Sequence, residues 1–212
     1  MERTLQPEIL DSLSPDDPAA LQSRRDLKIV NRIMGNERWF RQVLRRELRS
    51  GEQVLELGSG TGEIGMALSA AGIAINGLDL CPRPASWPRR SEWHQVDLRT
   101  FARYPEYSAV IANLTLHHLT AAELAALGRR FDGARLIVVS EPARRRRSQT
   151  LFAALGPMLG ANQITLHDAQ ISIAAGFLGD ELPRGLGLEL NRWRWRCWVS
   201  FLGAYRMIAM RL

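Results

Sequence analysis

The sequence predicts an α/β fold with a mostly parallel sheet, a C-terminal antiparallel hairpin and an N-terminal helical lid. Three patterns lead to this prediction. From residue 51 onward, short apolar runs alternate with amphipathic stretches at helical spacing. The first run leads straight into a glycine-rich turn, whereas the last two are joined by a short connection around Ser200. Because parallel strands need long helical crossovers and antiparallel strands do not, the early strands are expected to be parallel and the last pair antiparallel.

Residues 1–50 are expected to form a helical extension and residues 51–212 the α/β domain. Two apolar stripes recur at helical spacing in the extension, formed by Leu27, Val30, Ile33 and Met34 and then by Phe40, Val43, Leu44 and Leu48. Gly35 and Asn36 separate them, so we expect two helices with a turn between them.

The α/β domain contains five runs with the length of buried strands, at residues 53–57, 74–80, 93–98, 109–114 and 135–140. Helices are expected at residues 63–71, 121–131, 148–159 and 168–175, and the final hairpin pairs residues 188–199 with 201–211. Between the second and third strands, Pro82, Pro84 and Pro88 disfavour a regular helix, so we expect a loop there.

The composition is that of one globular domain with an appendage. The chain has 212 residues, 46% of them hydrophobic and 24% charged, which excludes disordered, collagen-like and coiled-coil classes. Apolar runs stay well short of the ~18 residues of a membrane-spanning helix and the first residues lack a signal-peptide pattern, so a cytoplasmic location is expected. Cys81 and Cys197 are too few for a disulfide framework or a cysteine-rich zinc site.

The basic residues favour anionic partners without identifying one. The net charge is +6, and every basic residue except Lys28 is an arginine. The run from Arg144 to Arg147 is interpreted as a solvated face, with contact to an anionic acceptor or surface as the alternative. Trp193, Trp195 and Cys197 alternate with arginines, a pattern that can bind nucleic acid but that two faces of one strand explain more simply.

A glycine turn carries the clearest functional signal. The first strand, VLEL, runs into a turn and a helix through Glu56, Gly58, Ser59, Gly60 and Gly62. Glycines suit a tight turn where a ligand approaches the backbone. A dinucleotide-binding fingerprint would require a small residue at position 63, where this chain has a glutamate.

This turn resembles the first motif of class I S-adenosylmethionine-dependent methyltransferases, an acidic residue followed by Gly-x-Gly-x-Gly. The next two strand ends are also similar: GLDL places Asp79 where the family's acid binds both ribose hydroxyls, and QVDL places Asp97 beside the adenine. Strand four, VIANLTLHHL, and strand five, ending in SEPA, continue the resemblance.

The resemblance implies a Rossmann-like seven-stranded methyltransferase sheet and S-adenosylmethionine as cofactor, with no metal. The cofactor-binding residues that it implies are Glu56, Gly58, Ser59, Gly60, Gly62, Asp79, Leu80, Asp97, Leu98 and Asn113. Two alternatives are that the glycines and acids only turn and cap the chain, or that the pocket binds cofactor without turnover.

The fourth strand end favours a small-molecule acceptor over nucleic acid. Enzymes that methylate base amines carry Pro-Pro-aromatic after this Asn113 position, and this chain has no proline there. Neither cysteine is placed to attack a base. The LHH sequence instead resembles methyltransferases of quinol, polyketide and phenolic acceptors, for which a histidine base is suitable.

Three histidines are therefore candidate catalytic bases, His117, His118 and His167. The alternative for His117 and His118 is a histidine packed under the sheet edge. His167 precedes Asp168, which is expected to be the N-cap of a helix in the insertion before the sixth strand.

The N-terminal helices are predicted to cover the cofactor and acceptor cleft. In this arrangement Arg32, Met34 and Trp39 would contact the acceptor near the bend at Gly35. The alternative is that both helices only complete the core on the outer face of the sheet. Taken together, the sequence predicts methyl transfer to a small molecule, most simply at oxygen. An RNA or protein methyltransferase and a non-catalytic cofactor-binding protein are the alternatives.

Overall fold

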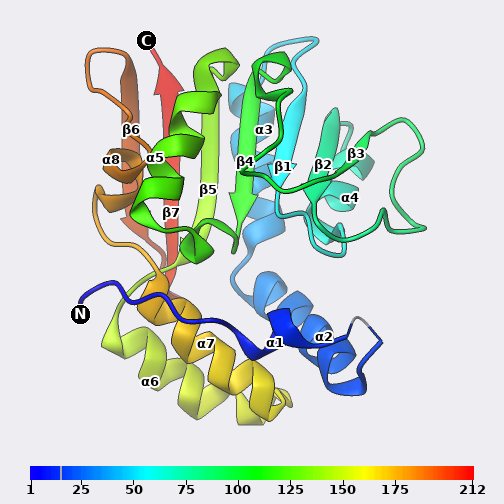
Figure 1. Cartoon of the computed structure of the whole chain (residues 1–212), viewed down its shortest axis with the longest axis vertical. Coiled ribbons are helices and arrows are strands. Elements are labelled where there is room, and N and C mark those ends of the chain that lie inside the picture. Colours follow the sequence, from blue (N-terminus) through cyan, green and yellow to red (C-terminus); the bar gives the residue numbers. More distant parts are fainter. Residues whose placement is uncertain (15) are drawn as a thin grey trace.

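Seven strands form a single sheet in the order β3-β2-β1-β4-β5-β7-β6 (Figure 1). The computed structural model describes residues 1–14 and 16–212. The strands are β1 Val54–Leu57, β2 Ile75–Asp79, β3 Trp93–Gln95, β4 Ala109–Asn113, β5 Leu136–Pro142, β6 Trp193–Val199 and β7 Ala204–Arg211. The first five are parallel, and β7 pairs antiparallel with both β5 and β6. The predicted mostly parallel sheet with its closing hairpin is confirmed.

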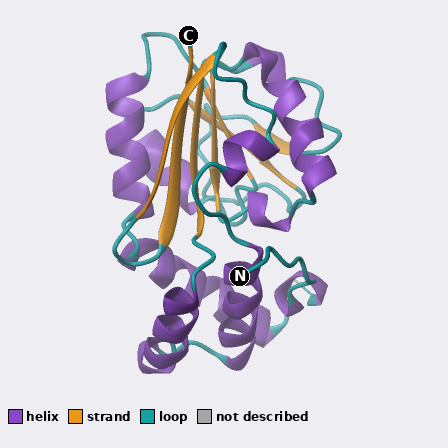
Figure 2. Cartoon of the chain, turned by 90° about the vertical axis from the view of Figure 1, so that its left-hand side faces the viewer, coloured by secondary structure: helices purple, strands orange, loops and turns teal. Residues whose placement is uncertain are grey.

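Helices cover both faces of the sheet, as the apolar strands require. The α-helices are α1 Ile9–Ser12, α2 Pro18–Ile33, α3 Asn36–Glu47, α4 Glu63–Ala70, α5 Ala121–Arg130, α6 Arg146–Leu155, α7 Gln163–Ala175 and α8 Glu181–Gly185. Short 3-10 turns are η1 Tyr104–Glu106, η2 Leu116–His118, η3 Phe131–Gly133 and η4 Pro157–Leu159. One core packs α3 and α4 on the sheet, and a second core contains residues of α5 and α8. A third group of helices, α1, α2, α6 and α7, packs together beyond one end of the strands (Figures 1 and 2).

That third group lies at the carboxyl ends of the parallel strands. Strands β1 and β4 are neighbours in the sheet. The chain continues from β1 to β2 on one side and from β4 to β5 on the other, so the connections that leave these two strands run in opposite directions. Ligands of open α/β sheets bind in the crevice at such a switch point. The fold therefore places the ends of β1 and β4 beneath a helical cap.

The second N-terminal helix belongs to the core. Trp39, Phe40 and Leu44 of α3 are buried and pack with Val54 and Ile111 of the sheet. Of the two interpretations of the N-terminal helices, a cover over the cleft or completion of the core, the second therefore describes α3. By contrast, α2 contacts α7 in the cap. The boundary at residue 50 stays a prediction.

The start of α7 differs from the sequence prediction. The helix begins at Gln163, where the Asn162 side chain accepts a hydrogen bond from the Thr165 backbone N–H at 2.8 Å. The expected N-cap, Asp168, lies inside the helix, because the earlier Asn162 already caps it. Asp168 instead accepts hydrogen bonds from the backbone N–H groups of Ile9 and Leu10, both at 2.9 Å. It therefore joins α7 to the first turn of α1.

Two other sequence predictions concern irregular and strand segments. As expected, residues 81–92 contain no helix. Trp193, Trp195 and Cys197 of β6 pack on one core, whereas Arg194 and Arg196 are exposed, so strand alternation explains this pattern. Within residues 1–14 and 16–212, no helix combines the length and apolar character needed to cross a membrane.

Candidate functional site

The glycine turn after β1 has the conformation that a backbone-binding loop needs. Gly58, Gly60 and Gly62 have φ values of 62°, 54° and 81°, a left-handed region that disfavours other residues. A Cβ on Gly58 would lie 2.3 Å from Oγ1 of Thr115, so the end of β4 packs directly on this turn. A Cβ on Gly60 would meet nothing within 4 Å. The outer part of the turn is therefore open to a ligand.

Asp79 holds this turn from the neighbouring strand. One of its carboxylate oxygens accepts a hydrogen bond from the Gly60 backbone N–H and the other from the Cys81 N–H, each at 2.7 Å. Leu80 follows it at the edge and is 67% exposed. The structure thus brings the first two predicted cofactor motifs together at the ends of β1 and β2.

Glu56 lies beneath the same turn as a buried acid. Burial raises its pKa to about 8, and the charges of Asp79 and Glu63 act in the same direction. Its Oε2 atom has no hydrogen-bond partner among the described residues. The α4 backbone comes close, because a Cβ on Gly65 would lie 2.6 Å from this oxygen. A buried acid with one oxygen left unpartnered beside an open glycine turn is suited to a polar ligand.

The third predicted motif follows β3, and its acid is engaged by a neighbouring arginine. Asp97 binds Arg99 through both carboxylate oxygens, with the shortest contact at 2.6 Å. The carbonyl of Leu98 accepts a hydrogen bond from the Tyr104 hydroxyl at 2.7 Å. The Asp97 side chain is only partly exposed, and its adenine role stays a prediction.

An asparagine network joins β4 to the N-terminal helices. Asn113 donates a hydrogen bond to Oδ1 of Asn31 at 3.0 Å and accepts one from Asn36 at 2.9 Å. Ser140 of β5 donates to Oδ1 of Asn36 at 3.1 Å. Sequence analysis identified Asn113 and missed the contacts of Asn31 and Asn36, although an asparagine directly after Gly35 was a signal for a specific contact. This network fixes α2 and α3 at the end of β4.

The chain after β4 turns sharply and is held by one buried carboxylate. Leu114 has a φ of 54°, which is strained for a side chain with a Cβ. Glu141 of β5 is fully buried and accepts hydrogen bonds from the backbone N–H groups of Thr115 and Leu116 at 2.9 and 2.8 Å. Its other oxygen lies 2.6 Å from Nδ1 of His117. Glu141 thus positions the ring of His117 and the turn that carries both histidines.

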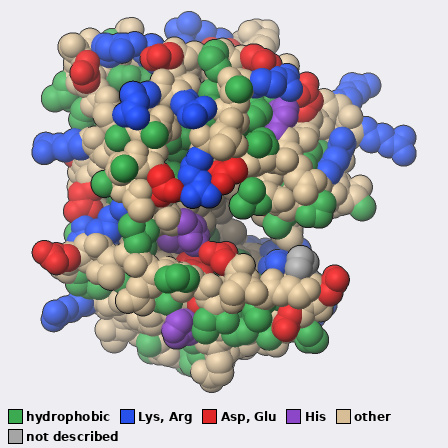
Figure 3. All heavy atoms as spheres, viewed as in Figure 1, with side chains coloured by type: hydrophobic (Ala, Val, Ile, Leu, Met, Phe, Trp, Pro, Cys, Tyr) green, Lys and Arg blue, Asp and Glu red, His purple; other side chains and the backbone are tan. Residues whose placement is uncertain are grey.

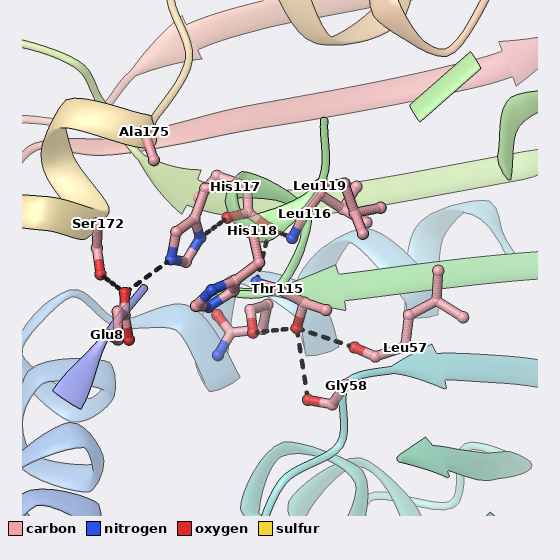
Figure 4. Close-up of polar contacts among 12 residues, drawn as sticks. Glu8, Leu57, Gly58, Thr115, Leu116, His117, His118, Leu119, Ser172 and Ala175 are labelled. Carbon is pink, nitrogen blue, oxygen red and sulfur yellow. Dashed lines mark hydrogen bonds and ion pairs between the residues drawn. The ribbon is translucent and has the colours of Figure 1, made fainter. Parts of the chain in front are cut away.

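His117 and His118 face the N-terminal segment. Nε2 of His117 lies 3.5 Å from Glu8 Oε1, and Ser172 of α7 also donates to Glu8 (Figure 4). Nδ1 of His118 lies 3.8 Å from Asp11. Sequence analysis missed Glu8 because its contacts are with residues more than 100 positions away.

The two histidines have opposite environments. Burial lowers the pKa of His117, but Glu141 and Glu8 outweigh that effect and raise it to about 9. Burial and the neighbouring His117 lower the pKa of His118. The side chain of His118 is 36% exposed, compared with 4% for His117. His118 is thus the more accessible of the pair.

A pocket of about 340 Å³ opens beside this pair. Its lining residues are Leu5, Gln6, Pro7, Glu8, Asp11, His117, His118, Ile171 and Ala175. Figure 3 shows a hollow on this face between the sheet and the helical cap, with histidine and acidic side chains at its margin. The carbonyls of His117, Leu119 and Ala175 accept hydrogen bonds from Arg3, at 3.0, 2.8 and 2.8 Å. The N-terminal segment therefore forms one wall of the pocket.

The remaining predicted acceptor residues lie outside this pocket. Trp39 is 7% exposed, its ring contacts those of Phe40 and Trp198, and the Arg206 guanidinium lies over it. Its position in the core gives no support for acceptor contact. Met34 ends α2, and its carbonyl binds Arg206 at 2.8 Å, while Arg32 is exposed.

His167 and the arginine run are also placed apart from the pair. His167 is 54% exposed on α7, with Nδ1 at 3.0 Å from Asp168. Arg144 is buried and binds the Gly176 carbonyl at 3.2 Å, together with Met1 and Glu181. The expected solvated face therefore begins at Arg145, because Arg144 ties the end of β5 to the N-terminus.

Comparison with solved structures identifies the fold. The plantazolicin methyltransferase BpumL in complex with S-adenosylhomocysteine is similar over 92% of this chain and 91% of its own, with a TM-score of 0.70 and 10% identity. BamL with a triazolic desmethyl-plantazolicin analogue and S-adenosylhomocysteine gives 0.69 at 10% identity, covering 95% and 92%. The methyltransferase domain of bacterial CtHen1 gives 0.54 at 14% identity, covering 82% and 96%.

Sequence comparison adds no assignment, because no protein-family model and no curated protein matches the chain. The structural likeness extends over nearly the whole chain. It agrees with the strand order, the glycine turn and the antiparallel hairpin. This chain has the class I S-adenosylmethionine-dependent methyltransferase fold.

Proposed function

We propose that the protein is an enzyme that transfers a methyl group from S-adenosylmethionine to a small-molecule acceptor. The observation that carries the proposal is the open glycine turn, with Asp79 bonded to it and the buried Glu56 beneath it, whose Oε2 atom has no hydrogen-bond partner among the described residues. Solved structures of the same fold hold S-adenosylhomocysteine, the product of such a transfer. A cytoplasmic location, predicted from the sequence, is part of this proposal.

The residues present fit the cofactor. The backbone of Gly58 and Gly60 would take its methionine end, and Asp79 would accept hydrogen bonds from its ribose hydroxyls. When bound, the cofactor supplies an activated methyl group on a sulfonium. The chain then has to align the acceptor and exclude water, as the N-terminal wall of the pocket allows.

The histidine pair supplies the acceptor side. His117 is fixed, because Glu141 and Glu8 lie at its two ring nitrogens. His118 is partly exposed and lines the pocket, which supports a role as the base that accepts a proton from the acceptor. A phenolic hydroxyl needs such a base near neutral pH, so methylation at oxygen is the acceptor chemistry that we propose.

The test begins with cofactor binding and ends with a product. Calorimetry of S-adenosylhomocysteine should show binding that replacement of Asp79 by alanine weakens. Mass spectrometry of extracts incubated with the protein and cofactor should reveal a product one methylene heavier. Replacement of His118 by alanine should lower turnover on that product by ~10²–10⁴-fold, more than replacement of His167. If no variant changes turnover, a histidine base is refuted.

The alternatives give different outcomes. Tight cofactor binding without any product across an acceptor panel would indicate a non-catalytic binding protein. The net charge of +6 favours the RNA or protein methyltransferase, and that interpretation predicts salt-sensitive binding of RNA or protein. The pocket volume of about 340 Å³ favours a small molecule.

A further inference from the structure

We infer that Glu8, His117 and His118 form a binding site for a divalent transition-metal ion of the zinc type at the wall of the pocket. Each of these side chains offers one ligand atom, and the three atoms lie within 4.8 Å of one another. The family resemblance implied no metal, and no sequence motif connects Glu8 to the histidines. The site goes beyond the cofactor and acceptor roles proposed above.

The first support is the distance between two of the ligand atoms. Nε2 of His117 lies 3.5 Å from Glu8 Oε1, too long for a good hydrogen bond. Ligands of a tetrahedral zinc at ~2.0–2.1 Å from the metal are about 3.4 Å apart. These two atoms are therefore spaced to share an ion with little movement.

The second support is the state of His117. Its Nε2 atom is buried, has no hydrogen-bond partner among the described residues and faces Glu8 only as an ion pair at 3.5 Å, so a metal ion would replace the proton between them. Its other nitrogen, Nδ1, lies 2.6 Å from Glu141. This is the carboxylate–histidine–metal arrangement, in which a buried acid fixes the ring so that the second nitrogen points at the ion.

The third support is the position of the cluster. The same three residues line the pocket of about 340 Å³, so an ion has a path of entry and a side open to a further ligand. Three protein ligands with one open position are typical of catalytic rather than structural zinc. Two imidazoles and one carboxylate favour zinc, iron or cobalt over magnesium.

The site changes the role of His118 when an ion is bound. A histidine that ligates a metal cannot take the acceptor's proton, whereas the ion itself lowers the pKa of an oxygen that binds it. This consequence rests on the proposed function. The ion would then favour acceptors with a hydroxyl that reaches the pocket wall.

The deciding experiment measures metal affinity and cofactor affinity separately. The untagged full chain is stripped with chelator and titrated with Zn²⁺, Co²⁺ and Mg²⁺ by calorimetry, with the Co²⁺ absorption spectrum recorded. We expect one Zn²⁺ per chain, an intense tetrahedral Co²⁺ spectrum and no Mg²⁺ binding. Glu8→Gln should weaken Zn²⁺ binding at least ~10-fold, because even an outer partner contributes ~10–100-fold.

His167→Ala is the matched control, because His167 also lies 3.0 Å from an acid but is exposed and separate from the cluster. It should bind Zn²⁺ as the wild type does. Equal affinity of wild type and Glu8→Gln, or absence of Zn²⁺ binding by the wild type, would overturn the site. The affinity for S-adenosylhomocysteine should be the same in Glu8→Gln as in the wild type. If the wild type does not bind S-adenosylhomocysteine, the proposed function is overturned and the metal site is not. If Glu8→Gln does not fold, His118→Ala decides in its place, because His118 offers another of the three ligand atoms.

Discussion

Replacement of Glu56 by glutamine should remove a pH-dependent loss of stability. Glu56 is 2% exposed, and its pKa of about 8 is far above the 4.5 of an unperturbed glutamate. In the folded chain the carboxyl keeps its proton up to about pH 8, whereas the unfolded chain releases it above pH 4.5. Between these values folding takes up a proton, so stability falls as pH rises. Glutamine has a similar shape and does not titrate.

The magnitude follows from the two pKa values. Each pH unit above 4.5 costs the wild type about 1.4 kcal/mol until pH approaches 8, so the cost is about 1 kcal/mol at pH 5.5 and about 3 kcal/mol at pH 7. The variant's free energy of unfolding, relative to wild type, should therefore rise by about 2 kcal/mol between pH 5.5 and pH 7.

Urea unfolding at several pH values measures this difference. Glu37→Gln is the control, because Glu37 is 50% exposed and its ion pair with Arg41 at 3.5 Å is a weak surface contact. Its difference from wild type should stay within about 0.5 kcal/mol. A pH-independent difference for Glu56→Gln would refute a buried, protonated Glu56.

Three further substitutions test other parts of the site. Asp79→Ala removes the carboxylate that accepts hydrogen bonds from two backbone N–H groups. It should weaken S-adenosylhomocysteine binding at least ~10-fold by calorimetry, since hydrogen bonds to charged groups contribute about 1.5–3 kcal/mol. Asp97→Ala should have a smaller effect, because the Asp97 carboxylate is bound to Arg99. Gly58→Ala should lower the melting temperature, because its Cβ would lie 2.3 Å from Thr115 at a φ of 62°; unchanged stability would contradict the packing. Trp39→Ala should lower the free energy of unfolding, measured with urea, by about 3–5 kcal/mol and leave the KM for the acceptor unchanged. A raised KM with intact stability would instead support the predicted contact of Trp39 with the acceptor.

The parallel sheet and the glycine turn were predictable because their signals are local. The strands at Val54–Leu57 and Ala109–Asn113 are short apolar runs whose period and length need no partner to be recognised. The glycine turn and Asp79 follow directly from strand ends. The amphipathic stripe of α3 was equally clear, but a stripe does not specify which surface it covers. This is why Trp39 was expected at the cleft and lies in the core.

The acceptor side was less predictable because its contacts join distant segments. Glu141 follows Ser140 at the end of an otherwise apolar strand, a visible signal of a buried functional acid, yet its partners at Thr115 and His117 are about 25 positions away. Glu8 gave no such signal in a polar N-terminus. Its role depends on α1 being held by Asp168, which the sequence suggested as a cap of its own helix.

The two sides of the site therefore depend on the fold in different ways. The cofactor side is one continuous strand, turn and helix braced by the adjacent strand, so few substitutions outside it can move Gly60 or Asp79. The acceptor side is assembled from the N-terminal segment, η2 and α7, which polar contacts such as Glu8 with Ser172 hold together. Substitutions in the N-terminal segment can thus alter the acceptor, or the proposed ion, while cofactor binding is retained. The same separation makes S-adenosylhomocysteine affinity a valid measure of folding for variants of Glu8 and His118.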